Sequence, residues 1–254
     1  MSPEVMALSF LAMVKTSQGY GDAARTYVAK ACVLADSINH DATSAFAHYY
    51  GTAVSGLEGD AGAALEHITE LVRVAHAAHF PHWIALGDYQ SAMLEAVRGD
   101  AREALPKILD AKSRVVNMGV GLLEPTYAVS AVPMNIAMGR MDEAATELAA
   151  AESAVERGGL YYFTSLIYRA RGLLAQAQNA ESAAQHFELA SERARGLGQT
   201  YFQVRALCDL LQLEKSKGDA ASTRKRLADV LATCDTAMLQ APDCRRAARL
   251  ISAD

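Results

Sequence analysis

Apolar and small residues recur along this chain at the spacing of one helical face. Ala183 is followed by Phe187 four residues later and by Ala190 seven residues later. Apolar or small residues follow Ala104 and Ala144 at the same two distances. Side chains three or four positions apart lie on one face of a helix, whereas strands bury alternate residues. The pattern predicts amphipathic α-helices.

A turn signal that leads into an alanine-bearing helix start recurs about every forty residues. It occupies Gly19–Ala24, Gly59–Ala64, Gly99–Ala104, Gly139–Ala144, Gln178–Ala183 and Gly218–Thr223, so the successive intervals are 40, 40, 40, 39 and 40 residues. Glycine tolerates the left-handed conformation that ends a helix, and aspartate caps the next helix. Each interval therefore predicts two antiparallel helices with a turn at its signal.

Other helices are predicted to begin at a proline or a capping residue, which suits the first helical turn. Such residues are Pro3, Asp41, Pro81, Pro125 and Pro242. The predicted fold is all-α, with six antiparallel helix pairs stacked in a solenoid and one terminal helix. Stacking is required because one hairpin cannot bury its own apolar face. The predicted single domain spans 1–254, with repeats at 3–40, 41–80, 81–120, 121–158, 159–198 and 199–238 and a terminal helix at 241–253.

The spacing of Ala183, Phe187 and Ala190 resembles the second helix of a tetratricopeptide repeat. That resemblance implies a right-handed superhelical solenoid. The usual tetratricopeptide period is ~34 residues, so a forty-residue unit implies longer helices.

Four segments narrow the resemblance: Phe80–Gly87, Gly121–Tyr127, Arg169–Leu174 and Pro242–Leu250. They are similar to parts of the C-terminal repeat region of bacterial adenylate/guanylate cyclase-like ATPases and related winged-helix and large ATP-binding transcriptional regulators. The resemblance implies a regulatory sensor region that relays a signal to an attached ATPase or output domain. Two features depart from that family: Phe163, Thr164 and Ser165 replace acidic residues, and Pro133 interrupts a helix.

Composition and charge limit the function further. Roughly one residue in five is alanine, and 24 basic against 29 acidic residues give a net charge of −5. Binding of nucleic acid normally requires clustered positive charge, so we expect no nucleic-acid partner. No apolar stretch approaches the ~20 residues of a spanning helix, and no secretory signal is recognised. We therefore expect a cytoplasmic protein with reduced cysteines and no membrane partner.

The sequence offers no motif for catalysis. It contains neither a Gly-x-x-x-x-Gly-Lys-Ser/Thr phosphate loop nor a Gly-x-Ser-x-Gly elbow. His76, His79 and His82 are spaced three apart, but Pro81 separates the last from the helix of the others and no further ligand lies at suitable spacing. The sequence thus predicts no catalytic residues, no cofactor and no metal ligands.

We expect a non-catalytic interaction module that binds a protein or peptide segment, including an attached domain of the same protein. A metabolite sensor with a ligand in the concave groove is the alternative. Positions fifteen and eighteen residues before each repeat alanine, or before Thr223 in the last repeat, share one face of the first helix. The candidate groove residues from these positions are Tyr49, Tyr89, Tyr168, Phe46, Leu86 and Arg205.

Overall fold

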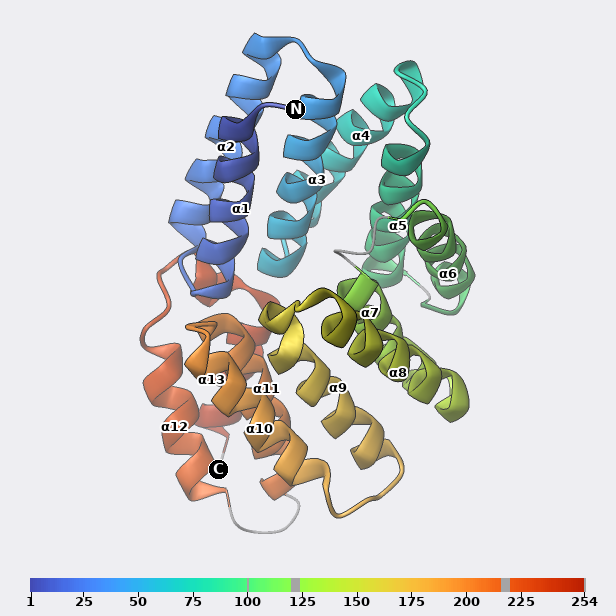
Figure 1. The fold of residues 1–254 in the computed structure, drawn as a ribbon. Helices are drawn as coiled ribbons and strands as arrows, with labels where there is room; N and C mark the ends of the chain where they lie inside the picture. Colours follow the sequence, from blue (N-terminus) through green and yellow to red (C-terminus); the bar gives the residue numbers. More distant parts are fainter. Residues whose placement is uncertain (100, 120–123, 216–219, 254) are drawn as a thin grey trace. The chain divides into compact units, whose positions relative to one another are not determined.

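The computed structural model describes residues 1–99, 101–119, 124–215 and 220–253, and within these ranges the chain is helical without any strand (Figure 1). The α-helices are α1 (Pro3–Ser17), α2 (Gly21–Ile38), α3 (Asp41–Glu58), α4 (Ala61–Ala77), α5 (Pro81–Arg98), α6 (Ala101–Asn117), α7 (Glu124–Ala137), α8 (Met141–Gly158), α9 (Thr164–Ala177), α10 (Ala183–Gly196), α11 (Thr200–Lys215), α12 (Ala221–Leu231) and α13 (Pro242–Ser252). Short 3-10 turns cover Tyr161–Phe163 and Met238–Gln240. The all-α prediction is confirmed.

The turns predicted near Gly19, Gly59, Gly99, Gly139 and Asn179 each lie between two consecutive helices. The sixth predicted turn, near Gly218, lies outside the described residues. Neither internal proline ends its helix, since α6 continues through Pro106 and α7 through Pro133.

Helix ends in the left-handed conformation recur at half the sequence period. Positive φ angles occur at Gly19, Asn39, Gly59, His79, Gly119, Gly139, Gly159, Asn179 and Gly198. Neighbouring residues of this series are 19 or 20 positions apart. The exception is the interval from His79 to Gly119, where Gly99 would continue the series but has a φ of −140°. The repeating unit at the level of backbone geometry is therefore a single helix with its cap.

Helices α3 and α4 each begin with a side-chain cap. The Asp60 carboxylate accepts a hydrogen bond of 3.0 Å from the Ala63 N–H, and His40 Nδ1 accepts one of 3.2 Å from the Thr43 N–H. These bonds satisfy donors that the first helical turn leaves without partners.

The helices belong to two compact units. The first comprises residues 1–16, 20–120 and 235–241, and the second comprises 17–19, 121–234 and 242–254. The single array expected over 1–254 remains a prediction.

In the first unit, neighbouring helices pack in chain order. Helix α3 is in extensive contact with α4, and α5 with α6, while α4 also packs on α5. Trp83 of α5 lies with its ring centre 6.1 Å from that of Phe46 and 6.0 Å from that of Tyr49, both on α3. Trp83 is 5% exposed, so it joins α3 and α5 through aromatic packing.

In the second unit, α7 packs on α8, α9 on α10, and α10 on α11, while α13 contacts both α11 and α12. One core cluster unites Val132 of α7, Leu148 of α8 and Ile167 of α9. The small side chains of Ala128, Ala144, Ala151 and Ala170 belong to the same cluster. Across the described part of the chain, every helix is too short or too polar to cross a membrane.

Candidate functional site

The first unit carries two adjoining depressions along α4, α5 and α6, which we call the α4–α6 groove. Their volumes are about 460 and 520 Å³. They share Ser91 and Glu95 of α5 and Lys107 of α6. Leu65 and Ile68 of α4 add apolar surface at one end, so the groove combines charged walls with an apolar region.

Helical spacing brings the groove side chains together. Asp88, Ser91 and Glu95 line the groove from α5 at intervals of three and four residues, and Lys107, Asp110 and Arg114 do so from α6 at the same intervals. Each set therefore forms a line along one side of its helix.

Ion pairs connect the two lines. Lys107 Nζ donates to Glu95 Oε2 at 2.6 Å, and Arg114 Nη2 donates to Asp88 Oδ2 at 2.9 Å. Arg114 Nε also donates to Asp110 Oδ2 at 3.0 Å. Donation of these hydrogen bonds to the carboxylates raises the pKa of Lys107 and of Arg114.

These pairs are open to solvent. The side chains of Lys107 and Glu95 are 60% and 53% exposed. Water and salt weaken such pairs, so a charged partner can exchange with them at small cost. The groove thus offers both signs of charge on a surface that a polar chain segment can reach.

The structure places four of the predicted groove residues inside the first unit's core. Tyr49 and Tyr89 are 5% and 3% exposed, and Phe46 and Leu86 are 8% and 2% exposed. The expectation that these side chains lie open in a groove is corrected by their burial. The repeat spacing identified a shared helical face, but that face packs against neighbouring helices. A binding role for the four residues stays a prediction.

Tyr168, in the second unit, is half-buried. The Arg171 guanidinium carbon lies 5.0 Å from the centre of its ring and that of Arg193 lies 5.9 Å away. These distances are typical of cation–π contacts. The ring is therefore already engaged by two cations of its own unit.

Arg205 belongs to a network of charges in the second unit. Its Nε lies 3.1 Å from Asp243 Oδ2, an ion-pair distance without hydrogen-bond alignment. Tyr201 donates its hydroxyl to the same carboxylate oxygen at 2.9 Å. Burial opposes charge on Asp243, but Arg205 and Arg169 outweigh it and lower the pKa of that carboxyl.

Asp209 of α11 is the second acid of this network. Its two oxygens accept hydrogen bonds from Arg169 Nε of α9 at 2.6 Å and from Arg246 Nη1 of α13 at 2.7 Å. The Asp209 side chain is 4% exposed. Through Asp209, Arg246 thus helps to fix α13 on α11 and α9.

The three histidines that are spaced three apart in the sequence do not come together as a group of metal ligands in the structure. His76 and His79 are exposed and His82 is half-buried. A different trio of metal-ligand types, Cys32, His48 and His67, comes together from three helices. Sequence reasoning missed it because its members are 16 and 19 residues apart and lie on separate helices, where no helical spacing links them.

No family model matches this sequence, and no curated protein is significantly similar to it. The functional proposal therefore depends on the chain's own residues and on the resemblance of its motifs.

Proposed function

We propose that this chain is a non-catalytic protein-interaction and regulatory module that binds a polar protein segment along the α4–α6 groove. The finer architecture belongs to the same proposal: a right-handed tetratricopeptide-like solenoid of six antiparallel helix pairs. The bound segment belongs to a partner or to an attached ATPase or output domain of a bacterial signalling or transcription-regulating protein in the cytoplasm.

The main support for this proposal is that the α4–α6 groove is open to solvent and carries both acidic and basic side chains. Asp88 and Glu95 lie opposite Arg114 and Lys107, and each pair is solvent-exposed. A bound segment with both acidic and basic side chains can form new ion pairs with these four residues in place of the internal ones. Only a segment whose charges are spaced to match would do so, which gives specificity. The apolar surface at Leu65, which is 45% exposed, supplies a place for a hydrophobic anchor.

The alternative is a small-molecule sensor. Metabolite sites are usually enclosed and mostly apolar, with a few converging polar groups. The α4–α6 groove differs because it is open and its polar groups pair across it, so its chemistry suits an extended segment better than a compact ligand.

Selection from a displayed peptide library against the purified chain tests the proposal. Peptides with alternating charge should be enriched, and their binding should weaken at high salt. The variants Lys107→Glu and Arg114→Glu should reduce their affinity about tenfold or more, a change of ~1.4 kcal/mol or above.

Lys30→Glu is the matched control, since Lys30 is an exposed lysine of α2 in the same unit. It should leave peptide affinity unchanged. Peptides whose binding ignores the Lys107 and Arg114 reversals would refute the groove as the binding surface. Enrichment of no peptide, together with saturable binding of a metabolite, would favour the sensor.

A further inference from the structure

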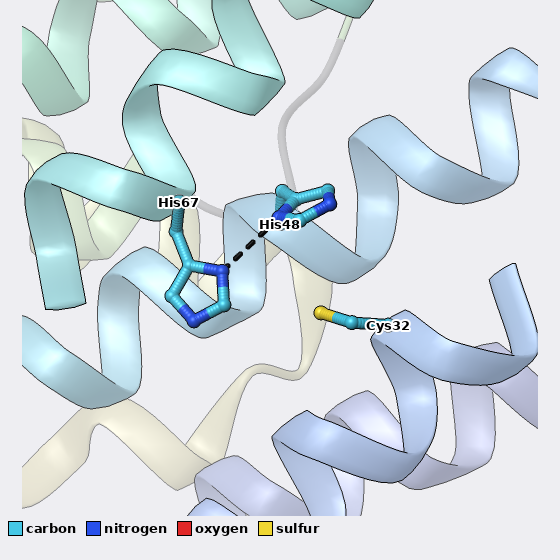
Figure 2. Close-up of side chains that lie close together, drawn as sticks. All are labelled: Cys32, His48 and His67. Carbon is cyan, nitrogen blue, oxygen red and sulfur yellow. Dashed lines mark hydrogen bonds between the residues drawn. The ribbon is translucent and has the colours of Figure 1, made fainter. Parts of the chain in front are cut away.

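Three metal-ligand side chains converge within the first unit, and none of them lines the α4–α6 groove. Cys32 comes from α2, His48 from α3 and His67 from α4, and Figure 2 shows the sulfur atom and both imidazoles directed toward one another. One donor atom from each residue lies within 4.8 Å of the other two. The two Nδ1 atoms of the histidines are 3.0 Å apart.

The backbone of α3 makes room for this arrangement. A Cβ at Gly51 would lie 2.7 Å from His67 Cε1 and 2.8 Å from Cδ2 and Cγ of the same ring. Only glycine at this position lets the imidazole lie against α3 and approach His48, one helical turn earlier. The position of His67 is therefore built into the packing of α3 on α4.

The donor separations suit a four-coordinate transition-metal ion. Zn–N bonds of about 2.0–2.1 Å in a tetrahedron place two nitrogens about 3.3 Å apart, and a Zn–S bond of about 2.3 Å places sulfur about 3.5 Å from each nitrogen. The nitrogens need to separate by only a few tenths of an ångström, and the sulfur needs to move inward by up to about 1.3 Å from the 4.8 Å limit on the donor separations.

We propose that Cys32, His48 and His67 form a binding site for a zinc-class transition-metal ion, with the fourth coordination position left for water or an added ligand. One thiolate and two imidazoles are donors of the softness that Zn²⁺ and Co²⁺ prefer, whereas Mg²⁺ and Ca²⁺ prefer oxygen.

Without metal, His48 and His67 are joined by a hydrogen bond between their Nδ1 atoms. One imidazole donates its Nδ1–H and the other accepts through its Nδ1 lone pair. When metal binds, both Nδ1 lone pairs coordinate it, and the displaced Nδ1 proton is carried by Nε2 of the same ring. The Cys32 thiol gives its proton to solvent as the S–metal bond forms. The metal keeps its oxidation state, and the net exchange is one metal ion taken up for one proton released.

Titration of the chelator-treated full chain with Co²⁺ tests the proposal. We expect one equivalent to bind, with a thiolate-to-cobalt charge-transfer band and the visible bands of four-coordinate Co²⁺. Zn²⁺ should displace the cobalt, and excess Mg²⁺ should not. Zn²⁺ should also slow alkylation of Cys32 while leaving the rates at the other three cysteines unchanged, and this measurement needs no variant.

Cys32→Ser should abolish the charge-transfer band, and His67→Gln should weaken Co²⁺ binding by at least about tenfold, since even loss of an outer-shell partner costs that much. His76→Gln is the matched control because His76 is an exposed histidine of the same helix as His67, and it should bind as the unmodified chain does. A cobalt spectrum without the thiolate band, or unchanged alkylation of Cys32 in saturating Zn²⁺, would overturn the proposal.

Discussion

The ring of Phe187 on α10 lies directly against the backbone of Gly172 on α9. A Cβ at Gly172 would lie 2.5 Å from Phe187 Cδ1 and 3.0 Å from its Cγ. Phe187 is 0% exposed, so its ring has no solvent-facing space into which it could retreat. The closeness of this helix pair thus depends on a missing side chain on one helix and a large ring on the other.

Gly172→Ala should therefore destabilise the second unit, although alanine usually favours a helix. The added methyl group overlaps the Phe187 ring, and overpacking of this kind costs about 1–3 kcal/mol. Urea denaturation followed by circular dichroism measures the change. The control is Gly56→Ala in α3, where a Cβ would meet nothing within 4 Å. It should gain about 0.5–1 kcal/mol, and equal effects of the two substitutions would refute the packing argument.

Phe187→Ala should cost on the order of 3–5 kcal/mol, as large buried aromatics do. The cavity cannot collapse easily because the facing residue is glycine and offers no side chain to fill it. Phe10→Ala provides the comparison, since Phe10 is 39% exposed, and its loss should be clearly smaller. A loss below about 1 kcal/mol for Phe187→Ala would mean that the ring is not the anchor of this repeat.

Asp209→Asn should destabilise the second unit by about 3–5 kcal/mol, because it removes the buried carboxylate charge that the guanidinium groups of Arg169 and Arg246 share. Thermal unfolding of the variant measures this loss. Glu95→Gln breaks an exposed pair and should change stability little. If both substitutions have equally small effects, the Asp209 network does not hold α13 in place.

The stability of the first unit should fall as the pH is lowered from about 6.5 to about 4. Burial lowers the pKa of His48, and burial together with His48 lowers the pKa of His67 to about 4. Asp36 and Glu70 oppose this decrease at His48, and Arg73 adds to it. In this range the unfolded chain binds protons that the folded chain does not, so acid favours unfolding.

Denaturation in the presence of a chelator at pH 7.5 and pH 5 measures this dependence. His67→Gln removes one of the two depressed groups, so its stability should change less between the two pH values. An identical loss in the variant and the unmodified chain would assign the pH dependence to other groups.

The positions of the helices were predictable because their signals are local. A glycine that tolerates positive φ, as at Gly59, and a capping aspartate such as Asp60 act within one or two turns of backbone. The burial of Phe187 followed from the same spacing, since a large residue four positions after Ala183 shares its face. Local rules thus accounted for where helices begin, where they end and which face is apolar.

The candidate sites were not predictable in the same way. The spacing that selected Tyr49 and Tyr89 is the same whether that side of the helix faces a groove or the core. Only the packing of neighbouring helices determines which of the two it faces. The meeting of Cys32 with His67 depends on how three helices pack and on the space that Gly51 leaves. Neither condition leaves a pattern in a single helix, which is why the sequence predicted no metal ligands.

The length of the helices has a consequence of its own. Helices α2, α3, α5 and α8 each contain 18 residues, which is five turns at 3.6 residues per turn. A helix with a whole number of turns receives the chain and releases it on the same side of its axis. One inserted residue would rotate everything after it by about 100°, and the inward-facing alanines would then point elsewhere. We therefore expect such chains to tolerate insertions in their turns and to preserve helix length even where the residues themselves change.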